Sequence, residues 1–142
     1  VSAWSLYEPG FSVDNWAYDG KQILCRAGNV LYSLGGINGD TYDSSAVEVQ
    51  MPFLDAGQAA TYKDFYGLDV TCENEWNISV ATDPQDITIL EDVATVHKTT
   101  YGLGRVTMTG YSTHIAPKLT CDKPGAAKIG NIAIHYNATE AG

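Results

Sequence analysis

The chain has 142 residues, of which 44% are hydrophobic and 18% charged, with a net charge of −9. This supports one ordinary domain, or a domain and a smaller unit. Its eight Lys and Arg residues are scattered, so we expect no sequence-specific nucleic-acid binding. No apolar run approaches the roughly 20 residues that span a bilayer, so we expect no membrane contact.

Residues 1–36 predict a β-hairpin unit. The runs KQILCR and VLYSLGG flank the sequence AGN, whose Gly28 and Asn29 tolerate the positive φ of a tight turn. The stretch INGDTYDSS, residues 37–45, consists of turn formers and hydroxyl residues and predicts a linker. We therefore assign residues 1–45 to a hairpin unit with its linker.

Residues 46–142 predict a second unit of antiparallel strands. Apolar and polar residues alternate in several runs, as in strands with one buried face, and turn-forming residues separate the runs. Strands are expected at 46–54, 63–73, 75–82, 86–97, 103–111, 113–122 and 127–137. The predicted fold class is all-β, with a β-sandwich or jelly roll at 46–142.

The alternation predicts which side chains of three strands face the core. Gly130 is expected to mark a β-bulge in the last strand. The expected inward residues are Leu68, Val70, Cys72, Trp76, Ile78, Val80, Ile132, Ile134 and Tyr136.

Three cysteines, Cys25, Cys72 and Cys121, cannot all pair within one chain. Their wide spacing matches no metal-binding pattern. We expect buried, reduced thiols, with a Cys72–Cys121 bridge as the alternative.

No pattern for catalysis or metal binding is convincing. His97, His114 and His135 fall in different predicted strands, and none shares a ligand spacing with another candidate. Ser112 in GYSTHIA lacks the second glycine of a nucleophile elbow, and a strand follows in place of a helix. We expect no catalytic centre, no metal and no cofactor.

Paired carboxylates for glycoside hydrolysis are a further alternative. Most of the acidic residues fall in predicted turns, where an Asp side chain caps local N–H groups, so we favour solvated turn carboxylates. The acidic candidates are Asp14, Asp40, Asp43, Glu73, Glu75, Asp83, Asp86, Glu91 and Asp92.

Aromatic residues make up 11% of the chain, which suits a carbohydrate-binding module that stacks sugars on exposed rings. The best candidates are Trp4, Trp16, Tyr18 and Tyr42, in loop-like stretches. We prefer the interpretation that the Trp rings anchor the junction between the two units.

The stretch MPFLDAGQAATYKDFYGLDV, followed by a Trp-containing strand, has a family resemblance. It resembles the C-terminal part of β-propeller proteins at the head–tail junction of short-tailed phages: the tail hub, nozzle and packaged-DNA-stabilisation proteins. In that family a strand, loop and strand carry the pattern TPxxDxG…K. The matching residues here are Pro52, Phe53, Leu54, Asp55, Gly57 and Lys63. Residues 1–36 resemble a closing propeller blade.

The resemblance implies a structural virion protein of the tail or head–tail junction, not an enzyme. Its partners would be other virion proteins and further copies of the chain in a homo-oligomeric ring. A chain of 142 residues cannot hold a whole propeller, and it lacks a starting Met, so we expect a fragment or a processed product. The expected contact residues are Pro52, Phe53, Asp55, Gly57, Lys63, Ile134 and His135.

Lys63 has two structural uses in this interpretation. It can pair with Asp55 or Asp64 and hold the connection in register, or it can dock the acidic edge of a neighbouring subunit. The alternative function is a carbohydrate-binding module or a receptor-binding domain of the tail-fibre type.

Overall fold

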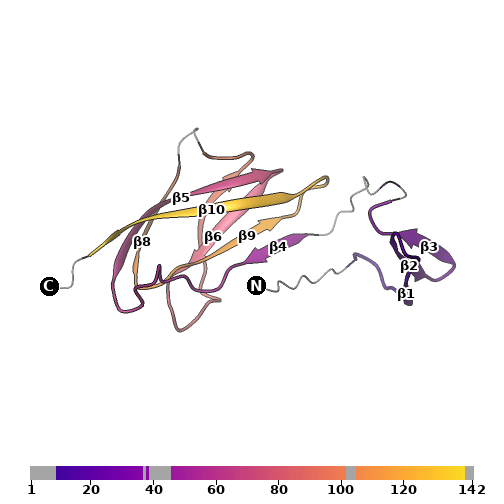
Figure 1. Cartoon of the computed structure of the whole chain (residues 1–142), viewed down its shortest axis with the longest axis horizontal. Coiled ribbons are helices and arrows are strands. Elements are labelled where there is room, and N and C mark those ends of the chain that lie inside the picture. The colour runs from indigo at the N-terminus through magenta and orange to yellow at the C-terminus, as the bar shows by residue number, and fades with distance from the viewer. Residues whose placement is uncertain (1–8, 37, 39–45, 102–104, 140–142) are drawn as a thin grey trace. The chain divides into compact units, whose positions relative to one another are not determined.

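A computed structural model of the chain describes residues 9–36, 38, 46–101 and 105–139. The chain divides into two compact units, Val1–Ser45 and Ala46–Gly142. All regular structure in the described residues is β-strand (Figure 1), so they contain no helix that could cross a membrane. The predicted all-β class is confirmed.

The first unit contains one antiparallel sheet of three short strands in the order β1-β2-β3. These are β1 (Asn15–Tyr18), β2 (Ile23–Ala27) and β3 (Val30–Ser33). Gly28, in the turn between β2 and β3, has a φ of 59°, as the hairpin requires. The Gly28 N–H donates a hydrogen bond of 2.8 Å to the carboxylate of Asp14.

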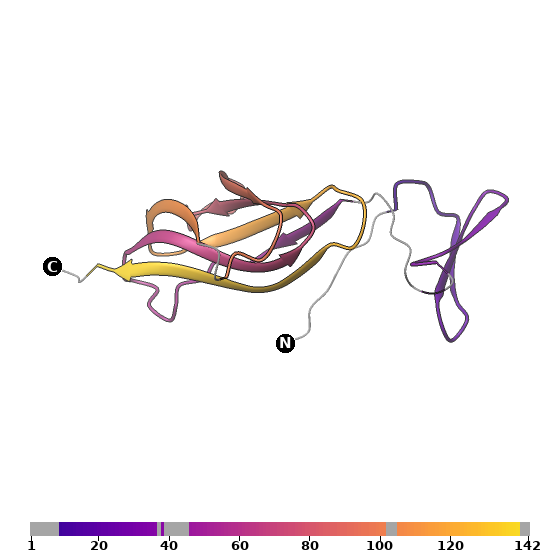
Figure 2. The ribbon, with the colours of Figure 1, turned by 90° about the horizontal axis from the view of Figure 1, so that it is seen from above.

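The second unit is a sandwich of two antiparallel sheets, seen as two layers in Figure 2. One sheet has the order β10-β5-β8 and consists of β5 (Lys63–Glu73), β8 (Val106–Ser112) and β10 (Lys128–Ala138). The other has the order β4-β9-β6-β7 and consists of β4 (Val47–Gln50), β6 (Trp76–Ala81), β7 (Glu91–Val96) and β9 (Ala116–Cys121).

The core lies between the facing sides of these two sheets. Alternate residues of β5 and β6 supply much of it, as the period of two in the sequence predicts. The buried members include Phe65, Leu68, Val70, Cys72, Trp76, Ile78, Val80, Ile115, Leu119 and Cys121. Each large apolar side chain removed from water contributes roughly 1.5–3 kcal/mol. The three cysteines are buried and free, so the predicted reduced thiols are confirmed.

Several predicted strands are shorter in the structure: the expected strand 113–122 is β9, which begins at Ala116, and two others differ more. The expected strand 46–54 is β4, which ends at Gln50, followed by an isolated bridge between Leu54 and Ile115. The expected strand 86–97 begins only at Glu91. The segment before it turns twice, because the carboxylates of Asp83 and Asp86 accept hydrogen bonds from N–H groups two residues ahead. These two carboxylates are the turn caps that the sequence predicted.

The last strand, β10, differs from the interior strands in its burial. Its register against β5 shifts between Ile129 and Ile132, which confirms the bulge at Gly130. Ile132, Ile134 and Tyr136 pack against the core, as predicted, but each stays only half-buried. β10 lies at the edge of its sheet, and the sandwich is therefore incompletely covered along this strand.

Candidate functional site

The connection between β4 and β5 carries the motif residues and folds as two successive turns. The N–H of Gln58 donates to the carbonyl of Asp55, and the N–H of Thr61 donates to the carbonyl of Gln58. Gly57 has a φ of 73°, and its N–H bonds the Asp55 carboxylate at 2.9 Å. Asp55 and Gly57 therefore shape this loop.

Lys63, the first residue of β5, is completely buried at 0% exposure. Its ammonium donates three hydrogen bonds, to the carbonyls of Gln58 at 2.8 Å, Thr61 at 2.9 Å and Thr113 at 3.0 Å. An ammonium has three donors, and all three are satisfied by backbone. Lys63 thus fastens its own loop to the chain just beyond β8.

This geometry corrects both expectations for Lys63. Backbone carbonyls take the place of the Asp55 or Asp64 carboxylate as its partners. Its burial and its three bonds leave no donor for the acidic edge of a neighbouring subunit. The inference that it holds the connection in register is supported by a different set of contacts.

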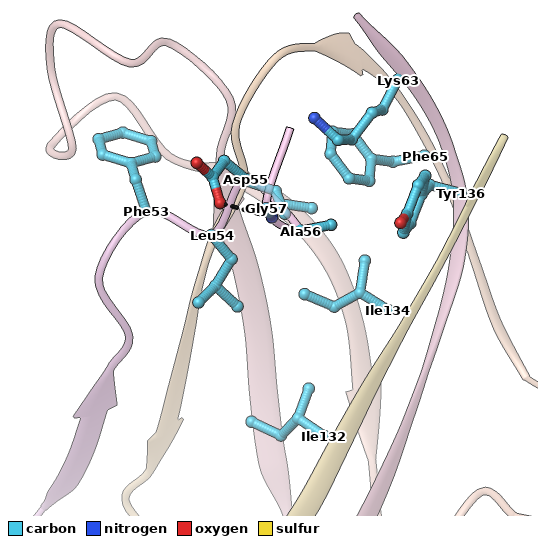
Figure 3. A pocket seen from close by; sticks show the side chains of 11 residues that line it. Phe53, Leu54, Asp55, Ala56, Gly57, Lys63, Phe65, Ile132, Ile134 and Tyr136 are labelled. Atoms are coloured by element: carbon cyan, nitrogen blue, oxygen red, sulfur yellow. Dashed lines mark hydrogen bonds between the residues drawn. The ribbon is translucent and has the colours of Figure 1, made fainter. Parts of the chain in front are cut away.

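Beside this loop is an apolar pocket of about 470 Å³. Figure 3 shows side chains of the loop on one side and of β10 on the other, with Lys63 and Phe65 above. Five of the seven expected contact residues line it, namely Phe53, Asp55, Gly57, Lys63 and Ile134. Six lining residues lie outside the expected contact set: Leu54, Ala56, Phe65, Ile115, Ile132 and Tyr136. The inward alternation of β10 was the signal that could have added two of them.

His135 lies on the face of β10 opposite to Ile134, as alternation predicts. On that face its side chain contacts other side chains of the same unit. The imidazole Nε2 is 2.8 Å from the Asp69 carboxylate, and the His135 side chain is 31% exposed. The other oxygen of Asp69 accepts a bond of 2.8 Å from the hydroxyl of Thr100. The Thr100 hydroxyl and His135 together hold the pKa of the Asp69 carboxyl below its ordinary value.

Tyr66 and Arg105 continue this polar cluster across the outer face of the sheet. The Arg105 guanidinium stands 5.3 Å from the centre of the Tyr66 ring, and the His135 ring lies 6.0 Å from it. A Cβ at Gly67 would come within 2.8 Å of the Arg105 side chain. The glycine thus lets this arginine cross the strand. The cluster ties the edge strand to its sheet.

One face of the three-stranded sheet in the first unit is apolar throughout. The strand registers place seven residues on this aromatic face: Trp16, Tyr18, Ile23, Cys25, Ala27, Val30 and Tyr32. Only Cys25 is buried; Trp16 is 49% exposed and Tyr18 is 70% exposed. Of the four candidates for sugar stacking, these two lie on the aromatic face, while Trp4 and Tyr42 fall outside the described residues.

The other chemical candidates have separate structural partners. His97 contacts Glu75, and the imidazole of His114 lies 2.7 Å from the hydroxyl of Thr113. The Ser112 hydroxyl donates to a backbone carbonyl at 2.6 Å, so it is not paired with an imidazole base. Within the described part of the chain, no three His, Cys, Asp or Glu side chains gather as a metal site would require.

Comparison of the chain with protein-family models, with curated proteins and with solved structures found no match.

Proposed function

We propose that the chain is a structural subunit of a virion, at a phage tail or head–tail junction, and that it works through contacts with further copies and other virion proteins. The proposal begins from the resemblance of the Pro52–Lys63 connection to the family motif. Its physical support is the surface that the described residues leave uncovered.

The aromatic face of the first unit is the observation that carries this proposal. A sheet of three strands, each four or five residues long, has the smallest number of strands that is stable in water, and that stability requires a hydrophobic face. Here one whole face is apolar, and five of its large side chains are more than 40% exposed, namely Trp16, Tyr18, Ile23, Val30 and Tyr32. Contiguous exposed apolar patches mark interaction surfaces. A propeller blade has this property, because neighbouring blades cover its faces.

The net charge of −9 is compatible with the same role. A DNA-conducting channel or adaptor benefits from repulsion, which removes places where the DNA would stick.

A carbohydrate-binding module or receptor-binding domain is the second candidate. Trp16 and Tyr18 project from the same face of β1, two residues apart. Exposed rings side by side on a sheet are able to stack on sugar rings. This alternative uses the same surface for a different ligand.

Two variants of the full chain separate these functions. Tyr18→Ser alters the aromatic face, and Leu31→Ser is the matched control, because Leu31 is 67% exposed on the opposite face of the same sheet. For a virion subunit, Tyr18→Ser should lower the mass of the assembly in solution and its incorporation into particles, while Leu31→Ser should not. For a sugar binder, Tyr18→Ser should remove binding on a glycan array at unchanged mass. If Tyr18→Ser changes neither property, both functions are refuted for this face.

A further inference from the structure

One edge of the sandwich offers its backbone to another strand. β10 pairs with β5 on one side, and no strand in the described ranges pairs with its other side. The strand has 11 residues, about 36 Å at a rise of 3.3 Å per residue. Natural proteins usually protect such edges with charge, Pro, a bulge or a short strand. The bulge at Gly130 protects only the first part of this one.

The part of β10 after Gly130 has no charge and no Pro. A second register shift lies between His135 and Tyr136, but its extra residue, Tyr66, belongs to β5, so β10 itself continues there without a bulge. From 132 to 138 the sequence IAIHYNA contains no Pro, Lys, Arg, Asp or Glu, and His135 is already held by Asp69. The other edges differ. β7 begins with two carboxylates, and β4 has only four residues. β8 is shorter than β10, with seven residues.

The direction of the backbone groups on the free edge follows from one hydrogen bond. The N–H of Thr139 donates to the carbonyl of Tyr62, on the β5 side, at 3.1 Å. Backbone groups alternate between the two sides of an antiparallel strand, so the odd-numbered residues of this stretch bond toward β5. Ile132, Ile134 and Tyr136 therefore present N–H and C=O to the free edge. The same three residues turn their side chains to the pocket.

We propose that this edge pairs antiparallel with β10 of a second copy of the chain, about a two-fold axis at Ile134. In this register Ile134 meets its own symmetry mate, and Ile132 meets Tyr136 of the second copy. Aromatic and β-branched pairs of this kind stabilise neighbouring strands. All three positions present the outward backbone groups that an added strand needs. The contact is therefore self-complementary, as a two-fold interface requires.

In this register the side chains on the polar face of β10 are also compatible with those of the second copy. His135 faces Ala133 of the second copy, so the two imidazoles do not oppose one another. Asn131, which lies in the bulge beside Gly130 at the end of the paired stretch, faces Asn137, and two neutral amides meet. No pair in this stretch places like charges together, which would be destabilising.

The second copy also explains the open side of the pocket. Its β10 would lie 4.7–4.9 Å beyond the first. Its inward side chains would then continue the apolar lining formed by Ile132, Ile134 and Tyr136, which are half-buried in the single chain. A two-fold pair differs from the rotational contacts of a ring. This inference goes beyond the virion role and holds whether or not that role is correct.

A charge pair at Asn131 and Asn137 tests the register. Both residues are exposed, and they lie about 20 Å apart along one strand, so charges there barely interact within a single chain. In the proposed dimer Asn131 of each copy faces Asn137 of the other copy, so this pair occurs twice about the two-fold axis. Two double variants share Asn137→Lys: the opposite-charge variant adds Asn131→Glu, and the like-charge variant adds Asn131→Lys.

Sedimentation of the full chain over a wide concentration range gives the answer. The wild type should reach twice the 15.3 kDa of the chain. The like-charge variant should dimerise at least about tenfold more weakly than the opposite-charge variant, with the same circular dichroism and melting temperature at low concentration. A wild type that stays monomeric up to millimolar concentration overturns the proposal. Equal association of the two double variants, or association at another mass that neither pair alters, overturns it as well.

Discussion

Lys63→Met should destabilise the sandwich unit by about 2–4 kcal/mol. The methionine keeps most of the apolar stem but removes the ammonium that bonds the carbonyls of Gln58, Thr61 and Thr113. Through its bonds to these carbonyls, Lys63 joins the loop before β5 to the chain after β8. We expect the loop to lose its anchor and the mouth of the pocket to loosen.

The magnitude follows from two opposing effects. A hydrogen bond to a charged group contributes roughly 1.5–3 kcal/mol, and Lys63 makes three. The variant no longer buries a charge, which recovers several kcal/mol of desolvation. In addition, Gln58 is an exposed residue, so water can replace part of what its carbonyl loses. The difference leaves a cost well below the sum of three bonds.

Urea unfolding of the full chain measures this cost. Lys118→Met is the matched control, because Lys118 is also a strand lysine with one partner, Glu48, at 3.0 Å, and that partner is 56% exposed. A surface pair of this kind contributes at most about 1 kcal/mol. If the two variants unfold within about 0.5 kcal/mol of each other, a difference typical of surface substitutions, the three carbonyl bonds do not stabilise the fold and the reasoning is refuted.

Two further predictions follow from the edge strand and its neighbour. Ile134→Lys should lower the free energy of unfolding by about 1–3 kcal/mol, because the half-buried position lets the ammonium reach water. Ile78→Lys, at a position that is 1% exposed, should prevent folding. Equal losses of stability in urea unfolding would contradict the open edge. The pKa of Asp69 is lowered in the folded chain. The stability that its carboxylate gives the fold is therefore complete above the ordinary pKa of an Asp carboxyl and is lost as the pH falls through the lowered pKa. Asp69→Asn should therefore flatten the acid side of the stability–pH profile, and an unchanged acid side in urea titrations would contradict the role of Thr100 and His135.

The strands that the sequence predicted well are those with one face in the core. Leu68, Val70 and Cys72 alternate without interruption, and one-residue slips would turn all of them to solvent, so pattern and structure must agree. The segment 83–90 was less predictable. Its apolar residues suggest a strand, but the Asp side chains at 83 and 86 bond nearby N–H groups and turn the chain instead.

The candidate site was predictable only in part, because its contacts join distant segments. The loop residues were singled out because they resemble a motif of another protein family, and the inward residues of β10 through alternation. Nothing in the sequence brings these two groups to one pocket. The carbonyl of Thr113 as a partner of Lys63 is also invisible to any side-chain pattern, since every residue has a carbonyl. Similarly, the pairing of His135 with Asp69 depends on the register of β10 against β5.

That pairing changes how the outer face of β10 must be probed. His135→Glu would be a nearly silent surface change if His135 faced only water. It would instead bring a second carboxylate beside Asp69, whose side chain is 13% exposed, so a loss of stability in this variant says nothing about an interface. Asn131 and Asn137 avoid this ambiguity because both are exposed and neutral. The free edge and the aromatic face are therefore best tested by substitutions at positions on which the fold of the single chain does not depend.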